Sequence, residues 1–327
     1  MVVRVTPAVG LYDQARTIVI SHLAAGRLVS VTATSRRSDG VWSARATFKA
    51  ASGLVDLARD APVSGSYRGV SPMGLFWSEH RVGPGSASPG VTSTTIAVSA
   101  ASRRLVSGHV TQLLSGPGVT EHVERGATAG FYGEYFAPPG SGRRPAVVVW
   151  GGSERGLSEG PSMAALLASH GIPALALAYF DEPGLPCSLS NIPLEYFARA
   201  IRWLGSQPEV DRGRVWAMSG SRGSEAALLV ASHWPQLVHG VVVSAPSSEI
   251  YGSIEGQCST TAPAAWTLDG APLPHAYVAV SDVVYQPDGS ASGSAGVPGR
   301  AGRRRSGSGR PDPGAADQGA CAADQRW

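Results

Sequence analysis

The chain has 327 residues, of which 43% are hydrophobic and 16% charged, so most of it can bury a core. The formal net charge of +3 is too small to predict nucleic-acid binding, and it comes from arginine because Lys49 is the only lysine. No apolar run is long enough to span a bilayer, and residues 1–7 lack the features of a signal peptide. The three scattered cysteines, Cys187, Cys258 and Cys321, argue against a disulfide framework and fit a reducing cytoplasm.

The N-terminal part, residues 3–125, is predicted to be an all-β domain. Short segments rich in β-branched residues are separated by Gly, Pro and Ser, and no helical periodicity competes with them. Several short strands at this spacing predict a β-sandwich. The clearest of these segments are 16–20, 28–33, 42–48 and 94–98.

The pattern changes near residue 135, where strands begin to alternate with helices. This alternation predicts an α/β domain with a mostly parallel sheet over residues 135–286. Pro and Gly between Pro138 and Gly142 predict a hinge in front of it. The expected elements are a strand at 146–150, a helix at 162–170, a strand at 174–180, a helix at 194–204, a strand–turn–helix unit at 214–230 and a strand at 238–243.

The last part of the chain, residues 287–327, has a different composition. Gly, Ser and Ala lead into a run rich in Arg, and almost nothing there can be buried. We therefore expect this tail to be disordered. A basic interaction segment is the alternative interpretation, and a solvated end without a role is the one we favour.

The strand–turn–helix unit at 214–230 carries the candidate nucleophile, Ser221. The context is that of a nucleophile elbow, in which a strained turn of small residues exposes the serine hydroxyl at the end of a parallel sheet. Ser219 replaces the first Gly of the usual Gly-x-Ser-x-Gly pattern, and Gly223 supplies the second. The Arg222 amide would begin the helix and could donate to an oxyanion. The alternative interpretation is an ordinary Gly/Ser-rich turn.

Several longer motifs connect this elbow to a known family. They are 65–67, 71–78, 151–154, 175–180, 184–186, 192–197, 221–225, 245–248 and 269–274. In these motifs the chain, up to about residue 285, resembles the acyl-CoA thioesterase and bile acid-CoA:amino acid N-acyltransferase family. The resemblance implies a β-sandwich followed by an α/β-hydrolase domain. We expect no cofactor, and no metal because the sequence has no metal-ligand spacing. It also implies an acyl-CoA substrate, whose acyl group passes to water or to an amine.

The resemblance assigns roles to particular residues. Ser221 would form the acyl-enzyme, while a His takes its proton and an acidic residue orients that His. The oxyanion would be held by the Arg222 amide and by an amide of the Gly152–Ser153 turn, which follows a buried strand. Many animal transferases of the family use Cys as nucleophile, so the Ser here favours a hydrolase.

The base and the acid of the expected triad are not recognisable, and the α/β-hydrolase domain is therefore predicted to be incomplete. After Ser221 the only histidines are His233 and His239, which follow too closely in the chain, and His275, which precedes the family's catalytic loop. We expect the chain as written to be inactive or nearly so. Our hypothesis is a shifted or truncated reading frame near residues 283–290, which reading the gene in its other frames would test.

A few other polar residues allow two interpretations. Glu154 and Arg155 either touch substrate or are solvated loop charges, and Glu225 is expected to complement the dipole of the elbow helix. Asp181 and Glu182 follow a strand at the end of the sheet where α/β sites gather, so they either line the pocket or cap the next turn. A non-catalytic acyl-binding or partner-binding module is the second functional hypothesis. The sequence does not predict an oligomeric state.

Overall fold

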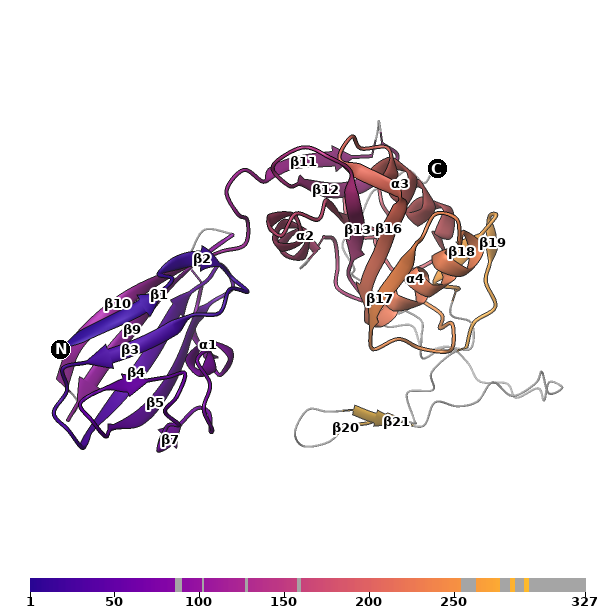
Figure 1. Ribbon diagram of the computed structural model, residues 1–327. Helices are drawn as coiled ribbons and strands as arrows, with labels where there is room; N and C mark the ends of the chain where they lie inside the picture. Colours follow the sequence, from indigo (N-terminus) through magenta and orange to yellow (C-terminus); the bar gives the residue numbers. More distant parts are fainter. Residues whose placement is uncertain are drawn as a thin grey trace. The chain divides into compact units, whose positions relative to one another are not determined.

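The computed structural model describes residues 1–85, 90–101, 103–126, 129–157, 160–253, 263–276, 283–285 and 291–293. Within these ranges the chain forms two compact units, the first holding Met1–Val119 and the second most of the residues from Thr120 onward (Figure 1). Each unit has a hydrophobic core of its own. The predicted fold class, an all-β part followed by an α/β part with a mostly parallel sheet, is confirmed.

The first unit is a pair of sheets with a shared core. The smaller sheet has the order β1-β3-β6, and the larger has the order β2-β10-β9-β4-β5-β7, with β8 also paired to β5. Ile18 and Ile20 of the smaller sheet pack in one cluster with Val31 and Phe48 of the larger, so the sheets lie face to face. The strands are β1 (Val2–Thr6), β2 (Val9–Leu11), β3 (Thr17–Ser21), β4 (Arg27–Arg36), β5 (Val41–Ala50), β6 (Val55–Asp56), β7 (Ser64–Gly65), β8 (His80–Gly83), β9 (Val91–Ala100) and β10 (Arg103–Leu113).

The four strand segments singled out in the sequence of this unit correspond to β3, β4, β5 and β9, and only Arg16, the first residue of the segment 16–20, lies outside its strand. Buried residues alternate with more exposed ones along β4 and β9, as expected for strands with one face on a core. The unit also contains a short helix, α1 (Gly74–Trp77), which was not predicted. One helical turn leaves no periodicity in a sequence, so pattern analysis could not have found it.

The second unit is built around one six-stranded sheet with the order β11-β12-β14-β13-β16-β17. The neighbouring pairs β14–β13, β13–β16 and β16–β17 are parallel. The pairs β11–β12 and β12–β14, at the other edge, are antiparallel. Every residue of β14 is buried, as is typical of a parallel strand covered on both faces. The strands are β11 (Thr120–Arg125), β12 (Tyr132–Ala137), β13 (Arg144–Trp150), β14 (Ala174–Ala178), β16 (Val210–Gly220) and β17 (Gly240–Ser244).

Three helices connect these strands: α2 (Gly160–Ser169), α3 (Leu194–Gly205) and α4 (Ser221–His233). The chain moves from β13 to β14 in one direction along the sheet, and from β14 to β16 in the opposite direction. Because parallel crossovers are right-handed, α2 therefore lies on one face of the sheet and α3 on the other, where α3 packs with α4 (Figure 1). A small sheet, β15-β18-β19, lies beyond β14 in the chain, and β20 and β21 form a separate pair. Their bounds are β15 (Ile192–Pro193), β18 (Trp266–Leu268), β19 (Ala271–Pro272), β20 (Val283–Tyr285) and β21 (Ala291–Gly293).

Two expectations about chain organisation meet different outcomes. The Pro/Gly stretch from Pro138 to Gly142 connects β12 to β13, and both strands belong to the same sheet, so this turn does not separate the two units. The division instead falls after Val119, and β11 already pairs within the second sheet. Of the tail predicted to be disordered, 287–327, only Ala291–Gly293 is described, and the rest lies outside the described residues.

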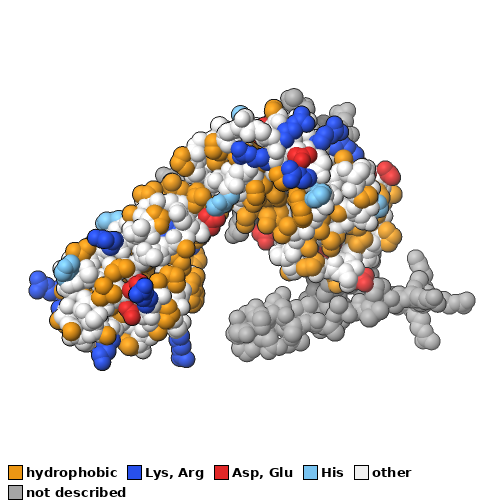
Figure 2. Space-filling view, in the orientation of Figure 1, with side chains coloured by type: hydrophobic (Ala, Val, Ile, Leu, Met, Phe, Trp, Pro, Cys, Tyr) orange, Lys and Arg blue, Asp and Glu red, His pale blue; other side chains and the backbone are white. Residues whose placement is uncertain are grey.

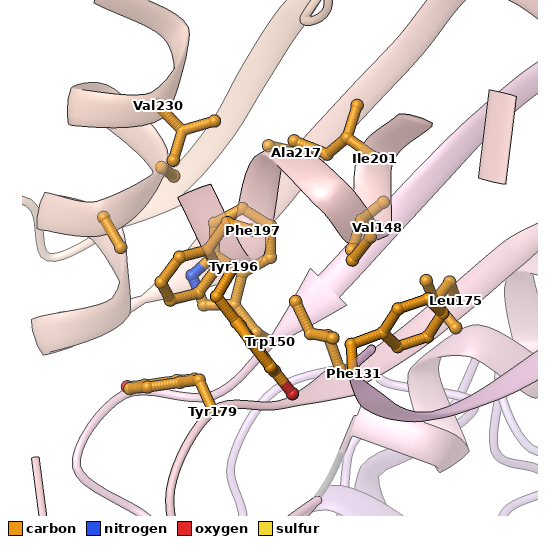
Figure 3. Packing of buried hydrophobic residues seen from close by; sticks show 14 of the residues in the cluster. Phe131, Val148, Trp150, Leu175, Tyr179, Tyr196, Phe197, Ile201, Ala217 and Val230 are labelled. Carbon is orange, nitrogen blue, oxygen red and sulfur yellow. The ribbon is translucent and has the colours of Figure 1, made fainter. Parts of the chain in front are cut away.

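The core of the second unit is centred on Phe197 of α3, which is completely buried. Its ring lies 5.0 Å from that of Trp150 and 5.3 Å from that of Tyr179, measured between centroids (Figure 3). The centroid of the Trp266 ring lies 6.0 Å away. Trp150 ends β13, and Tyr179 directly follows β14. The core therefore reaches the carboxyl ends of the central strands and supports the loops that leave them.

Candidate active site

Ser221 lies at the junction of β16 and α4, immediately after the last residue of the strand. Its φ is +49°, a left-handed conformation that costs a non-glycine residue about 1–3 kcal/mol. Gly220 before it is extended, and Ser221 itself is exposed. A strained turn with an exposed serine is the backbone geometry that a nucleophile elbow requires.

The turn after β13 lies directly against this junction. A Cβ atom added to Gly152 would be 2.9 Å from the Ser221 Cβ and 3.0 Å from the Gly220 carbonyl oxygen. On the other side, a Cβ at Gly223 would be 2.0 Å from the Gly151 carbonyl oxygen. Both glycines are needed because strand, turn and helix approach too closely for a side chain. The structure thus brings the predicted nucleophile and the predicted oxyanion turn together.

The serine that replaces the first Gly of the elbow pattern has a clear role. Ser219 is buried, and its hydroxyl donates a hydrogen bond to the Gly151 carbonyl at 3.3 Å. Its Oγ would lie 2.2 Å from a Cβ at Gly223, so the hydroxyl fits only because Gly223 has no side chain. The departure from the usual pattern therefore adds a bond between β16 and the oxyanion turn.

The amides predicted to hold the oxyanion differ in their surroundings. The Arg222 amide is among the first amides of α4 and has no partner within that helix. The Gly152 amide donates to the Glu154 carboxylate at 2.6 Å, a bond that sequence analysis did not predict. Within the described residues the Ser153 amide has no hydrogen-bond partner. An oxyanion could reach the Gly152 amide only after the Glu154 carboxylate moved away.

Two buried aromatic residues, Trp150 and Tyr179, hold this turn in place through hydrogen bonds. The Trp150 indole N–H donates to the Gly223 carbonyl at 2.9 Å, which ties β13 to the elbow helix. The Tyr179 hydroxyl donates to the carbonyls of Gly151, at 3.2 Å, and of Gly152. Burial raises the pKa of Tyr179 further above its ordinary value, which favours the protonated, hydrogen-bond-donating form. The peptides facing Ser221 are therefore held in place by the aromatic core.

The histidines that follow Ser221 are placed away from its hydroxyl or bonded elsewhere. His233 ends α4, about twelve residues of helix from Ser221, and His239 lies at the amino end of β17, beside Trp216. His275 is half-buried against Gly252, and its Nδ1 lies 3.0 Å from the Leu273 carbonyl. Among the described residues, no His or carboxylate bonds to the Ser221 hydroxyl.

The charged residues beside the site form two ion pairs that the sequence did not reveal. Arg155 pairs with Asp181 at 3.3 Å across two strand-end loops, and both are partly exposed. Arg222 pairs with Glu225, whose side chain is only 3% exposed. Glu225 lies one residue past the first turn of α4, and its carboxylate faces Arg222, not the helix's free amides, so the expected role as a dipole partner is replaced by an ion pair.

Basic side chains gather at the other end of the sheet from Ser221. Figure 2 shows arginine side chains over the part of the second unit where α3 and β11 lie. Arg143 precedes β13, and Arg212 and Arg214 lie in the first half of β16, whereas Ser221 follows the carboxyl end of that strand. The exposed arginines at the amino ends of these two strands are Arg143, Arg212 and Arg214.

Two kinds of site are not found in the described part of the chain. No group of three or more His, Cys, Asp or Glu side chains there could hold a metal ion. No helix among the described residues has both the length and the apolarity to cross a bilayer. Cys187 is half-buried in the loop after β14, and the other two cysteines lie outside the described residues.

Two family models match the chain. The model for the acyl-CoA thioester hydrolase/BAAT N-terminal region matches residues 13–124, and the model for the BAAT/acyl-CoA thioester hydrolase C terminus matches residues 192–271. The N-terminal model matches the earlier part of the chain and the C-terminal model a later part, which contains the elbow. The chain belongs to the acyl-CoA thioester hydrolase/BAAT family, as its motifs indicated.

Curated relatives include both hydrolases and transferases. Acyl-coenzyme A amino acid N-acyltransferase 2 of Mus musculus is 32% identical over 265 residues, which are 74% of this chain and 61% of the relative. Acyl-coenzyme A thioesterase 1 of Homo sapiens is 29% identical over 266 residues, 77% of this chain and 62% of the relative. The chain thus spans about three fifths of the length of these relatives.

Among solved structures, a hyperthermophilic esterase from the archaeon Pyrobaculum calidifontis aligns with 41% of this chain and 45% of its own, with a TM-score of 0.35 and 19% identity.

Proposed function

We propose that the second unit carries an acyl-CoA thioester site at which Ser221 is the nucleophile. Its Oγ attacks the thioester carbonyl, the C–S bond breaks, and CoA leaves as a thiol after taking up a proton. Water then cleaves the acyl ester and restores the serine. The Arg222 amide, with an amide of the Gly152–Ser153 turn, stabilises the oxyanion in both steps.

One observation carries this proposal: an exposed serine with a φ of +49° sits between a parallel strand and a helix, against a glycine turn. This strain is maintained by packing on both sides, at Gly152 and at Gly223. Strained residues held in this way are concentrated at functional sites. Membership of the family supports an acyl-CoA substrate.

We further propose that this chain performs the reaction slowly. A serine hydroxyl is a weak nucleophile without a base, and loss of a triad member costs about 10⁴-fold or more in rate. No His among the described residues forms a hydrogen bond with Ser221, and the three that follow it in the sequence have the positions and partners described above. The first chemical step, acyl transfer to Ser221, is therefore the step to measure.

Release of CoA thiol from octanoyl-CoA and palmitoyl-CoA tests the proposal. We expect slow release by the full chain, abolished by Ser221→Ala and unchanged by Ser232→Ala, which alters an exposed serine of the same helix. Equal release by the Ser221→Ala variant would show that the hydroxyl has no role. Turnover as fast as that of an intact Ser-His-Asp enzyme would refute the predicted impairment.

A second candidate, transfer of the acyl group to an amino acid, is favoured by the names of several relatives, which are amino acid N-acyltransferases. The same acyl-enzyme would then be cleaved by an amine instead of water. Adding glycine or taurine to the assay separates the two outcomes, because transfer produces an N-acyl amino acid detectable by mass. Free fatty acid alone would support hydrolysis.

A third candidate, a non-catalytic acyl-binding module, is favoured by the absence of a described His at the nucleophile. Such a module would bind acyl-CoA and neither release CoA nor form an adduct. Saturable binding of palmitoyl-CoA that is identical in the wild type and Ser221→Ala, without any thiol release, would select this candidate over the first.

A further inference from the structure

The carboxylate of Glu225 joins three separate segments behind the elbow. It accepts hydrogen bonds from the Arg222 guanidinium, from the Tyr251 amide at 3.3 Å and from the Trp266 indole N–H at 3.1 Å. These donors belong to α4, to the loop after β17 and to β18. A buried carboxylate that accepts three hydrogen bonds from three segments is held in a defined position and connects those segments.

The Arg222 side chain also bonds to the loop after β17. Its Nη2 donates to the carbonyls of Tyr251 and Gly252, each at 2.8 Å, and its guanidinium carbon lies 5.8 Å from the Tyr251 ring centroid. The planar guanidinium offers donors in a fixed fork, which defines its position better than a lysine ammonium would. The side chain next to Ser221 is thus pinned to a loop some 30 residues later in the chain.

The loop that receives these bonds is itself anchored. The Gly252 amide donates to the Ala276 carbonyl at 3.0 Å, and the Ala276 amide donates to the Ile250 carbonyl at 2.7 Å. The Ser253 amide donates to the Pro263 carbonyl at 2.8 Å. Because the anchor is fixed on both sides, the ion pair can hold the first turn of α4 in one place.

From this arrangement we infer that Glu225 is a positioning residue for the Ser221 site: through Arg222 it fixes the peptide whose amide is the proposed oxyanion donor. The inference rests on the proposed function. Glu225 touches no reacting atom. It acts by preventing movement of the Ser221–Arg222 peptide, and displacements of about 1 Å at such a peptide can cost on the order of 10²-fold in rate.

Two measurements on the full-length chain test this inference. The first is amide hydrogen exchange, comparing residues 219–224 with residues 228–233 of the same helix. The second is the rate at which an alkyl fluorophosphonate labels Ser221. For Glu225→Gln we expect exchange at 219–224 to rise about tenfold with 228–233 within about twofold, and labelling to slow about tenfold.

Glu79→Gln is the matched control, since it removes the same charge from a buried Arg–Glu pair in the first unit, and it should change neither measurement. If Glu225→Gln does not fold, Arg222→Lys replaces it, because lysine keeps the charge and loses the fork. Exchange that rises equally in both halves of α4, exchange that does not change, or unchanged labelling would each overturn the inference. A wild type that is never labelled at Ser221 would instead refute the proposed function, and the exchange comparison would still decide the positioning role.

Discussion

The two units of this protein each bury an Arg–Glu pair, and the pairs differ in what surrounds them. In the first unit Glu79 bonds to Arg37 and to Ser35 at 2.6 Å each, and Ser35 bonds to Thr94 at 2.7 Å. These partners lie on or beside strands of the sandwich. In the second unit the pair Arg222–Glu225 directly follows Ser221 and holds it to two other segments.

The comparison shows that a buried ion pair does not mark a functional site by itself. Burial raises the pKa of Glu79 and of Glu225 alike, because removal from water penalises both carboxylates more than their partners stabilise them. The physical cost is of the same kind in both units. What distinguishes the second pair is its place beside a residue with left-handed φ at the carboxyl end of a parallel strand.

The largest effect should come from filling the space that allows the elbow to form. Gly223→Ala places a methyl group 2.0 Å from the Gly151 carbonyl oxygen, so we expect a loss of about 4 kcal/mol or more in the free energy of unfolding. Gly213→Ala is the control, because its new Cβ would meet only the Asp211 carboxylate at 3.5 Å. Urea denaturation checks both variants, and equal stability of the two would contradict the packing described for the elbow.

The cores of the two units offer the next comparison. Phe48 and Phe197 are both completely buried, one in each unit, and replacing either by Ala should cost about 3–5 kcal/mol. Phe197 packs on Trp150 and Tyr179, which hold the oxyanion turn, whereas Phe48 packs within the sandwich. We therefore expect Phe197→Ala to slow fluorophosphonate labelling of Ser221 and Phe48→Ala to leave its rate unchanged at temperatures where both variants are folded.

Labelling that slows equally in both variants would contradict the separation of the site from the sandwich core. Stability is followed in the same samples by hydrogen exchange of strand peptides from each unit, so that loss of folding is not mistaken for loss of reactivity.

The smallest effect concerns pH. Because the folded-state pKa of both carboxylates is raised, each one contributes stability that is fully present below its ordinary pKa of 4.5 and is lost as pH rises through the raised value. Replacing Glu79 or Glu225 by Gln removes this dependence. The unfolding free energy of the wild type minus that of either variant should fall as pH rises from about 4.5, as measured by urea denaturation across pH. A difference that grows with pH would mean that the fold favours the ionised form.

Local patterns in the sequence predicted much of the second unit. Continuous apolar runs identified β13 and β14, and helical spacing identified α3, because each pattern reports the burial of its own segment. The elbow was predicted from its strand–turn–helix context, and the oxyanion role of the turn at Gly152 from the resemblance to the family. The structure brings these two together, as shown by the approach of Gly152 to Ser221.

The side-chain bonds of the site could not be predicted in this way. Glu225 bonds to Trp266, 41 residues away, and Tyr179 bonds to the oxyanion turn from 27 and 28 residues away. No periodicity in one segment reports a partner in another. The bond from Gly152 to Glu154 is local, but it depends on a rotamer choice that a sequence does not specify.

The most direct test of the account is to locate the acyl group after brief incubation of the full-length chain with palmitoyl-CoA, by acid quench, proteolysis and mass spectrometry. The account predicts one acyl adduct on Ser221 that is absent from the Ser221→Ala variant. An adduct on Cys187 instead, or no adduct on Ser221 at any time while CoA thiol is released, would contradict it.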